Sequence, residues 1–181
     1  ATHIMIIISA LLGTAGSVKG AAKGFDPSDK GDILVISGDS LTDFDLTAAA
    51  EFHKRRGAAA TLIVTQVDDP REYGLVRADA KGRVLGFVEK PGWAQAVTDA
   101  ANTGIYILSP SVLSHIPDNT AFDFAKDLFP LLLRKGIPLF AYEATGYWCD
   151  IGNLSTYLSC QRDILEGRLC TIPPPEGGVL C

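Results

Sequence analysis

The sequence predicts an α/β domain with a mixed, mainly parallel sheet. Continuous apolar runs at residues 32–37 and 60–67 are typical of strands covered on both faces. Between them, residues 46–58 have helical spacing, and such a strand–helix–strand unit favours parallel pairing and a right-handed crossover. Residues 74–91 instead alternate in hydropathy on either side of "DAKG", which predicts an antiparallel hairpin and makes the sheet mixed.

Local end signals delimit the helix at 46–58 and the elements that follow the hairpin. Asp45, directly before this segment, is the expected cap of the helix, and Gly57 near its end is the expected stop. Farther along, "NTGIYIL" (102–108) predicts a strand and "PSVLSHI" (110–116) a short helix.

The last third is predicted to alternate helices and strands. Residues 122–136 have a helical pattern that Asp123 can cap and that Gly136 ends, while Pro130 should kink or split it. Two strand-like segments and an amphipathic helix capped at Asn153 follow, at 138–144, 146–152 and 153–167.

Composition limits the partners of the chain. Its 181 residues carry a net charge of -5 and no cluster of Lys or Arg, so we expect no binding to nucleic acid or to an acidic membrane. Any phosphate must therefore be met locally, by a metal or by a few placed cations.

Four cysteines lie in the last third, without CxxC spacing. This pattern favours reduced thiols in a cytoplasm over a zinc site or a disulfide framework. The four are Cys149, Cys160, Cys170 and Cys181.

The two ends of the chain stand apart from the patterned part. Residues 1–11 include an apolar run that resembles a signal peptide but has no basic start and is too short to span a bilayer, so a buried strand is favoured. The alternative that this segment is a tag or a truncation junction is left open. Residues 12–167 form the expected domain, and the Pro- and Gly-rich residues 168–181 are expected to be a linker or the start of a truncated C-terminal region.

Two carboxylates stand where predicted strands end. Ligands of open α/β sheets bind beyond the carboxyl ends of the strands, and Asp39, directly after Gly38, and Asp150, two residues before Gly152, fall there. One or two carboxylates with phosphate and water oxygens suffice for Mg²⁺. Taken alone, Asp39 is more often a solvated turn residue, and Asp43 and Asp45 are weaker candidates still, Asp45 as a helix cap.

Seven ordered motifs resemble the nucleoside-diphospho-sugar pyrophosphorylases, in particular the mannose-1-phosphate guanylyltransferases. They extend from about Leu12 to about Gly167: "LGTAGSVK", "ISGDSLTDFDL", "EYGLV", "FVEKP", "NTGIYIL", "FDFAKDLFPLLL" and "GYWCDIGN". The resemblance implies a Rossmann-like nucleotidyltransferase domain that acts on a nucleoside triphosphate and a sugar-1-phosphate, as a cytoplasmic enzyme with Mg²⁺. It leaves open a homo-oligomer.

The resemblance also implies a role for each motif residue. Asp39 and Asp150 match the Mg²⁺ ligands, and Lys90 a residue that contacts the sugar phosphate; these three are the candidate catalytic residues. The remaining candidates match positions around the substrates: Gly74 and Glu89 at the sugar, Asn102 and Thr103 in the sugar pocket, and Gly13 and Thr14 in the loop that approaches the base.

One departure from the family bears on activity. The family's glycine-rich triphosphate loop, with its Arg and Lys, has no counterpart in this sequence, so the resemblance implies a fragment that lacks the first strand–helix units. The expected reaction is nucleotidyl transfer from a nucleoside triphosphate to a sugar-1-phosphate, giving GDP-mannose and pyrophosphate, with turnover of this chain alone near background. The alternative is a sugar-nucleotide-binding or regulatory homologue without turnover.

Overall fold

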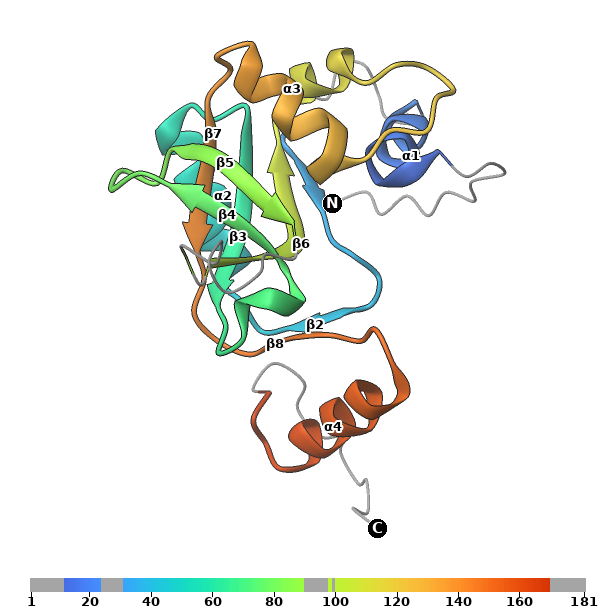
Figure 1. Ribbon diagram of the computed structural model, residues 1–181, viewed down its shortest axis with the longest axis vertical. Helices are drawn as coiled ribbons and strands as arrows, with labels where there is room; N and C mark the ends of the chain where they lie inside the picture. Colours follow the sequence, from blue (N-terminus) through green and yellow to red (C-terminus); the bar gives the residue numbers. More distant parts are fainter. Residues whose placement is uncertain (1–11, 24–30, 90–97, 99, 170–181) are drawn as a thin grey trace.

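The computed structural model describes residues 12–23, 31–89, 98 and 100–169. A six-stranded mixed sheet forms its centre (Figure 1). The strand order is β5-β4-β6-β3-β7, and β1 pairs with β6 outside this path. The strands are β1 Ile33–Val35, β3 Ala60–Gln66, β4 Gly74–Ala78, β5 Val84–Glu89, β6 Ala100–Leu108 and β7 Leu139–Glu143. The expected α/β class and mixed sheet are confirmed.

The expectation of a mainly parallel sheet is wrong for the described strands. Only β3 and β7 pair in parallel, whereas the β1–β6, β3–β6, β4–β5 and β4–β6 pairs are antiparallel. Residues 106–108 of β6 pair with β1 and also with β3, so β6 lies between these two strands. The connection through the helix at 46–56 therefore leaves β1 and β3 running in the same direction. They do not pair with each other, because β6, which is antiparallel to both, lies between them.

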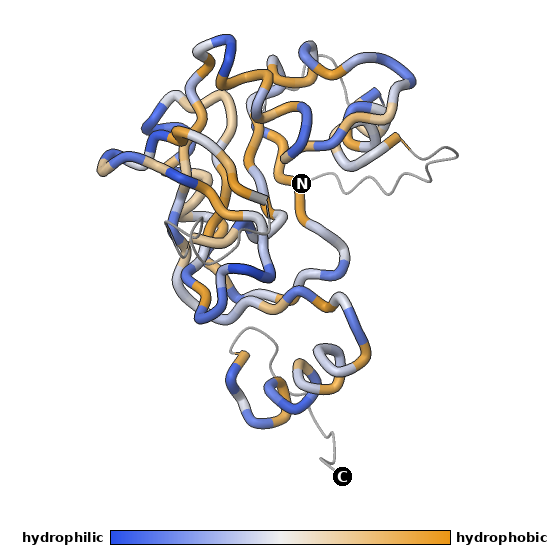
Figure 2. Tube along the Cα trace, viewed as in Figure 1, coloured by the Kyte–Doolittle hydropathy of each residue, from blue (hydrophilic) through white to orange (hydrophobic). Residues whose placement is uncertain are grey.

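Helices cover both faces of the sheet. Successive residues of a strand point to opposite faces, and in β3 Leu62 belongs to one buried cluster while Ile63 belongs to the other. The larger cluster includes residues of α1 (Gly13–Ala22), of the π-helical turn η3 (Phe124–Leu128) and of α3 (Phe129–Arg134). The smaller one includes Ala49 of α2 (Leu46–Arg56). Figure 2 shows the hydrophobic residues concentrated along the strands between these layers.

The predicted helix ends are confirmed. The backbone N–H of Ala48 donates to the Asp45 carboxylate at 2.9 Å, and Gly57 ends α2 in the left-handed conformation. Asn153 caps α4 (Leu154–Leu165) in the same way. The helix predicted at 122–136 is split, with Pro130 in the first turn of its second half, α3. The described residues also include two 3-10 helices, η1 Pro70–Glu72 and η2 Pro110–His115.

β1 is less covered than the sequence predicts. Leu34 is 48% exposed and Ile36 46%, and in the described ranges β1 pairs only with β6. The expectation of a strand covered on both faces is therefore wrong here. A continuous apolar run shows that a segment can be buried, but the neighbours that bury it come from elsewhere in the chain.

A second, two-stranded sheet lies beside the main one. β2 (Ser40–Thr42) pairs antiparallel with β8 (Trp148–Asp150), and α4 lies on the far side of β8 from the main sheet (Figure 1). Cys149 of β8 and Cys160 of α4 are joined by a disulfide, so the expectation of reduced thiols is wrong for this pair. In the described ranges, no helix is long and apolar enough to cross a bilayer. The segments 1–11 and 170–181 lie outside the described residues.

Candidate functional site

The small sheet brings Asp39 and Asp150 together. β2 starts directly after Asp39 and β8 ends at Asp150, and Ser40 is the register partner of Asp150. The carbonyl oxygen of Asp39 accepts a hydrogen bond of 2.9 Å from the backbone N–H of Ile151. The two aspartates, 111 positions apart in the sequence, are thus neighbours across two hydrogen-bonded strands.

The electrostatics of this pair suit a divalent cation. Partial burial raises the pKa of the Asp150 carboxyl above its ordinary value, and the negative charge of Asp39 raises it further. Bound Mg²⁺ offsets such repulsion, since it takes one or two carboxylates together with substrate and water oxygens. The described residues contain no group of three or more His, Cys, Asp or Glu that could hold a metal. A metal at this place would therefore rely on the two aspartates and on the substrate.

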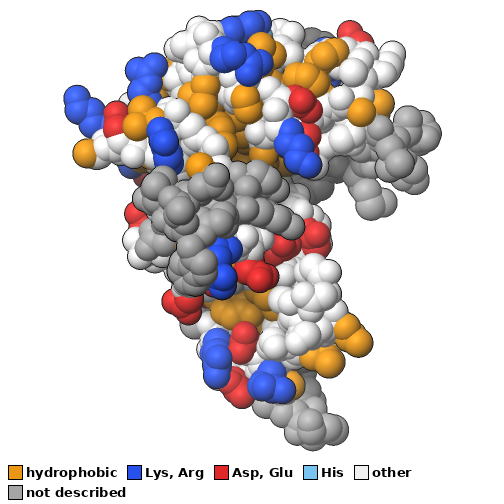
Figure 3. Space-filling model, in the orientation of Figure 1, with side chains coloured by type: hydrophobic (Ala, Val, Ile, Leu, Met, Phe, Trp, Pro, Cys, Tyr) orange, Lys and Arg blue, Asp and Glu red, His pale blue; other side chains and the backbone are white. Residues whose placement is uncertain are grey.

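Acidic side chains are grouped in the region between the main sheet and α4. Figure 3 shows Asp and Glu side chains grouped at the narrow part between the main body and α4. The hydroxyl of Ser37 donates a hydrogen bond to the carboxylate of Asp39 and orients it. Anionic substrates would have to approach these carboxylates with cations, which fits the expectation that a metal meets the phosphates.

A cavity of about 360 Å³ lies on the Asp150 side, and we call it the aromatic cavity. Tyr73 and Trp148 lie in its wall, and the centroids of their rings are 5.3 Å apart. The buried indole N–H of Trp148 has no hydrogen-bond partner in the described part of the chain. Burial, with a smaller contribution from the charge of Asp150, raises the pKa of Tyr73 and keeps its hydroxyl protonated. The wall also includes Thr65, Gln66, Val67, Asp68, Asp69, Glu72 and Gly146.

Sequence reasoning missed Tyr73 and Trp148, although both stand in the quoted motifs, next to Gly74 and two residues before Asp150. An aromatic pair in a cavity wall can stack on a ring-shaped ligand.

The candidate sugar-binding glycine directly follows a residue of this cavity wall. Gly74 follows Tyr73 and begins β4, where it is the register partner of Glu89 in β5. The two residues assigned to one sugar are therefore opposite each other in one hairpin. Lys90, which follows Glu89, lies outside the described residues.

A second cavity, of about 320 Å³, lies on the Asp39 side, and we call it the α1 cavity. Thr14 of α1 and Ser37, the hydrogen-bond donor to Asp39, both line it. Its wall is otherwise largely apolar and includes Val18, Val35, Ile36, Gly104, Tyr106, Asp123, Phe124 and Ala125.

Backbone conformation and packing are enough to explain why residue 13 is a glycine. Its φ is 66°, and a Cβ atom there would lie 2.7 Å from the carbonyl oxygen of Phe122. The hydroxyl of Thr14 donates to Asp123 at 2.8 Å and accepts from the backbone N–H of Phe124 at 3.0 Å. These contacts fasten the start of α1 to the cap of η3 and place Thr14 in the wall of the α1 cavity.

Asn102 and Thr103 lie on β6, where both side chains are engaged in internal hydrogen bonds. The hydroxyl of Thr103 is buried and donates to the carbonyl oxygen of Ile63 at 2.8 Å. The Asn102 amide donates to the Tyr106 hydroxyl at 3.0 Å and accepts from the backbone N–H of Gly104. Neither residue is part of the two cavity walls described above, and in this conformation they support the site from the sheet.

Known proteins resemble this chain over most of its length. The family model described as "Nucleotidyl transferase" matches residues 4–167. The UTP--glucose-1-phosphate uridylyltransferase of Synechocystis sp. is 36% identical over 173 residues, which are 93% of this chain and 44% of that protein. The mannose-1-phosphate guanylyltransferase catalytic subunit beta of Drosophila pseudoobscura pseudoobscura is 34% identical over 176 residues, which are 93% of this chain and 46% of that protein.

A solved structure supports the fold. HddC from Yersinia pseudotuberculosis complexed with GMP-PN has a TM-score of 0.71 at 29% identity, with 87% of this chain and 65% of that chain covered. The chain spans about half the length of the curated relatives described above. The family match nevertheless covers nearly all of the chain, including both candidate carboxylates, and the chain belongs to the nucleotidyl transferase family.

Proposed function

We propose that this chain carries the catalytic centre of a sugar-1-phosphate nucleotidyltransferase. In this reaction an oxygen of the sugar-1-phosphate attacks the α-phosphorus of a nucleoside triphosphate, and pyrophosphate leaves. The observation that supports it best is the pairing of Asp39 and Asp150 on adjoining strands, with the α1 cavity beside the first and the aromatic cavity beside the second.

The residues of the chain act by positioning and by charge. Asp39 and Asp150 would hold Mg²⁺, which supplies neutralisation of the phosphate charge when bound. Ser37 orients the Asp39 carboxylate, and the register of β2 with β8 holds Asp150 beside it. We assign the sugar to the aromatic cavity, with Gly74 next to Tyr73 of its wall and Glu89 as the register partner of Gly74, and the nucleotide to the α1 cavity, near Gly13 and Thr14. In-line transfer between two bound substrates needs no covalent intermediate with the protein.

For the substrates we favour GTP and mannose-1-phosphate. The Drosophila relative is named for mannose and guanylyl transfer, and the Yersinia structure holds GMP-PN. The Synechocystis relative is named for UTP and glucose, so the glucose pair is the competing choice. Lys90 remains the candidate for the sugar phosphate, and a cytoplasmic location remains a prediction.

The experiment measures binding and turnover separately. Isothermal titration with GDP-mannose and with UDP-glucose identifies the preferred product, while pyrophosphate release with Mg²⁺ and each substrate pair measures transfer. Asp39→Asn and Asp150→Asn should each lower Mg²⁺-dependent release by about 10²-fold or more, since each removes a charge that positions the metal. Asp118→Asn is the matched control, because it removes a carboxylate that pairs with Lys19 on the surface.

Three outcomes separate the hypotheses. Any measurable release that depends on Mg²⁺ and on both aspartates supports a transferase, even at the low rate expected without the triphosphate loop. Binding of the sugar nucleotide without release supports the non-catalytic homologue. If neither nucleotide sugar binds, or if Asp118→Asn lowers release as much as the site variants do, the assignment is wrong.

A further inference from the structure

Helix α4 is attached to the rest of the described residues by few contacts. Cys160 is its one buried residue, at 2% exposure. Several of its large apolar side chains face solvent: Leu154 is 73% exposed, Leu158 53% and Tyr157 47%. The burial of apolar side chains normally holds a helix in place, and here most of the apolar area remains exposed.

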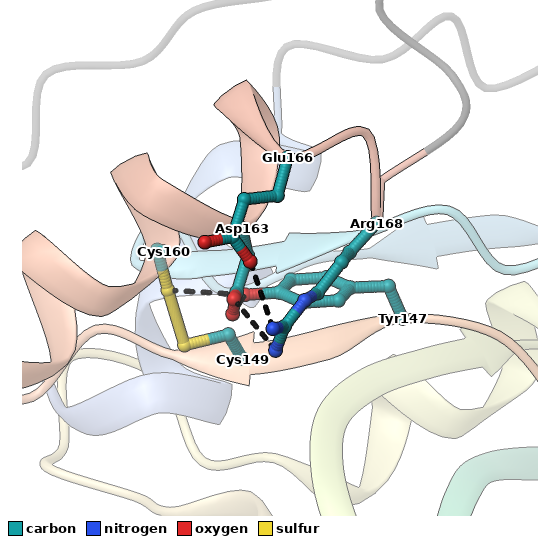
Figure 4. A network of polar contacts seen from close by, with 6 residues as sticks. All are labelled: Tyr147, Cys149, Cys160, Asp163, Glu166 and Arg168. Atoms are coloured by element: carbon teal, nitrogen blue, oxygen red, sulfur yellow. Dashed lines mark hydrogen bonds and ion pairs between the residues drawn. A yellow bond between two sulfur atoms is a disulfide. The ribbon is translucent and has the colours of Figure 1, made fainter.

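The attachment is centred on the side chains that Figure 4 shows. The disulfide links Cys160 to Cys149 of β8. The hydroxyl of Tyr147, just before β8, donates to Asp163 at 2.8 Å and lies 3.5 Å from the sulfur of Cys160. Arg168 then pairs with Asp163 at 3.2 Å, from the turn that follows the helix. The disulfide and the hydrogen bonds of the Tyr147 hydroxyl therefore join α4 to β8 and to the residue before it.

The disulfide also acts on the strand that carries Asp150. Cys149 is the central residue of the three-residue strand β8 and precedes Asp150 directly, and its register partner is Leu41 of β2. The Cα atoms of Cys149 and Cys160 are 7.0 Å apart. The oxidised pair therefore ties α4 to the centre of β8.

We propose that Cys149 and Cys160 are a reversible thiol–disulfide switch that fastens α4 to β8 when oxidised and lets the helix separate when reduced. The helix position then determines how firmly the short strand with Asp150 is held. Disulfides of intracellular proteins are mostly transient or redox-sensing, so a reversible role also reconciles this bond with the predicted cytoplasmic location.

The exchange chemistry balances with a small-molecule disulfide such as glutathione disulfide. Cys149, which is only partly buried, attacks one sulfur as a thiolate, and one glutathione thiolate leaves. The Cys160 thiolate then attacks the Cys149 sulfur of the mixed disulfide and releases the second glutathione. Two electrons pass from the cysteine pair to glutathione disulfide, and a dithiol such as dithiothreitol reverses both steps.

The test uses the 181-residue chain with Cys170→Ser and Cys181→Ser, so that only the pair can react. Mass spectrometry after alkylation measures the thiol state in a series of glutathione ratios. Hydrogen exchange is then followed in the oxidised and reduced protein, for peptides covering 147–152, 154–166 and, as an internal control, 60–66 of β3. Reduction should speed exchange in α4 and in β8 by about tenfold or more and leave β3 unchanged.

Variants separate the bond from general damage to the fold. Adding Cys149→Ser or Cys160→Ser should give the fast exchange of the reduced state under all conditions, and Cys160→Ala keeps the small buried side chain if serine prevents folding. The switch is refuted if the pair stays reduced in excess glutathione disulfide, stays oxidised in excess dithiothreitol, or changes state without changing exchange in α4. Neither substrate nor metal is present, so the result is independent of nucleotidyl transfer.

Discussion

The carboxylate of Asp43 accepts a hydrogen bond of 2.6 Å from the backbone N–H of Tyr147, a residue 104 positions farther along the chain. The backbone N–H of Asp43 donates in return to the carbonyl oxygen of Tyr147 at 3.2 Å. These two bonds close one end of the β2–β8 sheet, and Asp39 and Asp150 lie at its other end. Asp43 thus holds the register that places the candidate metal ligands side by side.

Asp43→Ala should therefore weaken both the fold and the candidate metal site. A lost hydrogen bond to a charged acceptor costs about 1.5–3 kcal/mol in the free energy of unfolding. Asp43→Asn is the matched control, because its amide oxygen can still accept from Tyr147. Urea unfolding and Mn²⁺ titration measure the two effects. Equal losses in both variants would mean that the charge of Asp43, and not its hydrogen bond, matters.

Gly13→Ala should destabilise the protein even if no nucleotide binds near this residue. The left-handed φ of 66° and the 2.7 Å approach to the Phe122 carbonyl oxygen leave no room for a Cβ atom. We expect a loss of about 1–3 kcal/mol in the free energy of unfolding. Gly20→Ala in the same helix is the control, since the nearest atom to its Cβ would be Leu12 Cδ1 at 4.0 Å. It should gain about 0.5–1 kcal/mol, because alanine favours a helix. Similar stabilities of the two variants would contradict the packing account.

Trp148→Phe should separate stability from ligand affinity. The buried indole N–H has no partner in the described ranges, so its removal should leave the free energy of unfolding equal or higher. If the indole ring stacks on the sugar, the smaller phenyl ring should lower the affinity for the sugar nucleotide by up to about tenfold. Tyr157→Phe on α4 is the control. Titration calorimetry and thermal melting give both values, and an unchanged affinity would remove Trp148 from the sugar site.

Acid should destabilise the protein through His53. This residue is 2% exposed, with Nδ1 2.8 Å from the Thr61 hydroxyl and Nε2 3.2 Å from that of Ser109. Burial lowers the pKa of His53 below its ordinary value of 6.5, while Asp32, 3.5 Å from Nε2, raises it by less. The unfolded chain therefore binds the proton more readily than the folded one. The contribution of His53 to stability is complete above pH 6.5 and is lost as the pH falls through the lowered pKa.

Urea unfolding between pH 8 and pH 5 measures this loss. His53→Gln, which can still hydrogen-bond to Thr61 and Ser109, should be less stable at pH 8 but should lose less stability between pH 6.5 and pH 5. The same pH dependence in both proteins would assign the acid effect to other groups.

The sequence alone determined many of the helices and strands, because their signals are local, but it predicted neither α1, where it placed Gly13 and Thr14 in a loop, nor β2. Asp45 and Gly57 bound α2, Asn153 begins α4, and Pro130 divides the helix after Asp123, as the caps and breakers predict. The order of motifs also identified the family and marked Asp39 and Asp150 as a candidate pair. Each of these inferences needs only residues close together in the chain, or motifs compared with those of relatives.

Only the tertiary structure decided which segments became neighbours. The insertion of β6 between β1 and β3, the exposure of Leu34, and the bond between Cys149 and Cys160 all depend on pairings between distant segments. Such pairings are selected by the packing of the whole sheet, and apolar runs or cysteine spacing carry little information about them. The same reason explains why Asp43 looked like a weak metal ligand, because its partner Tyr147 is adjacent only in the folded chain.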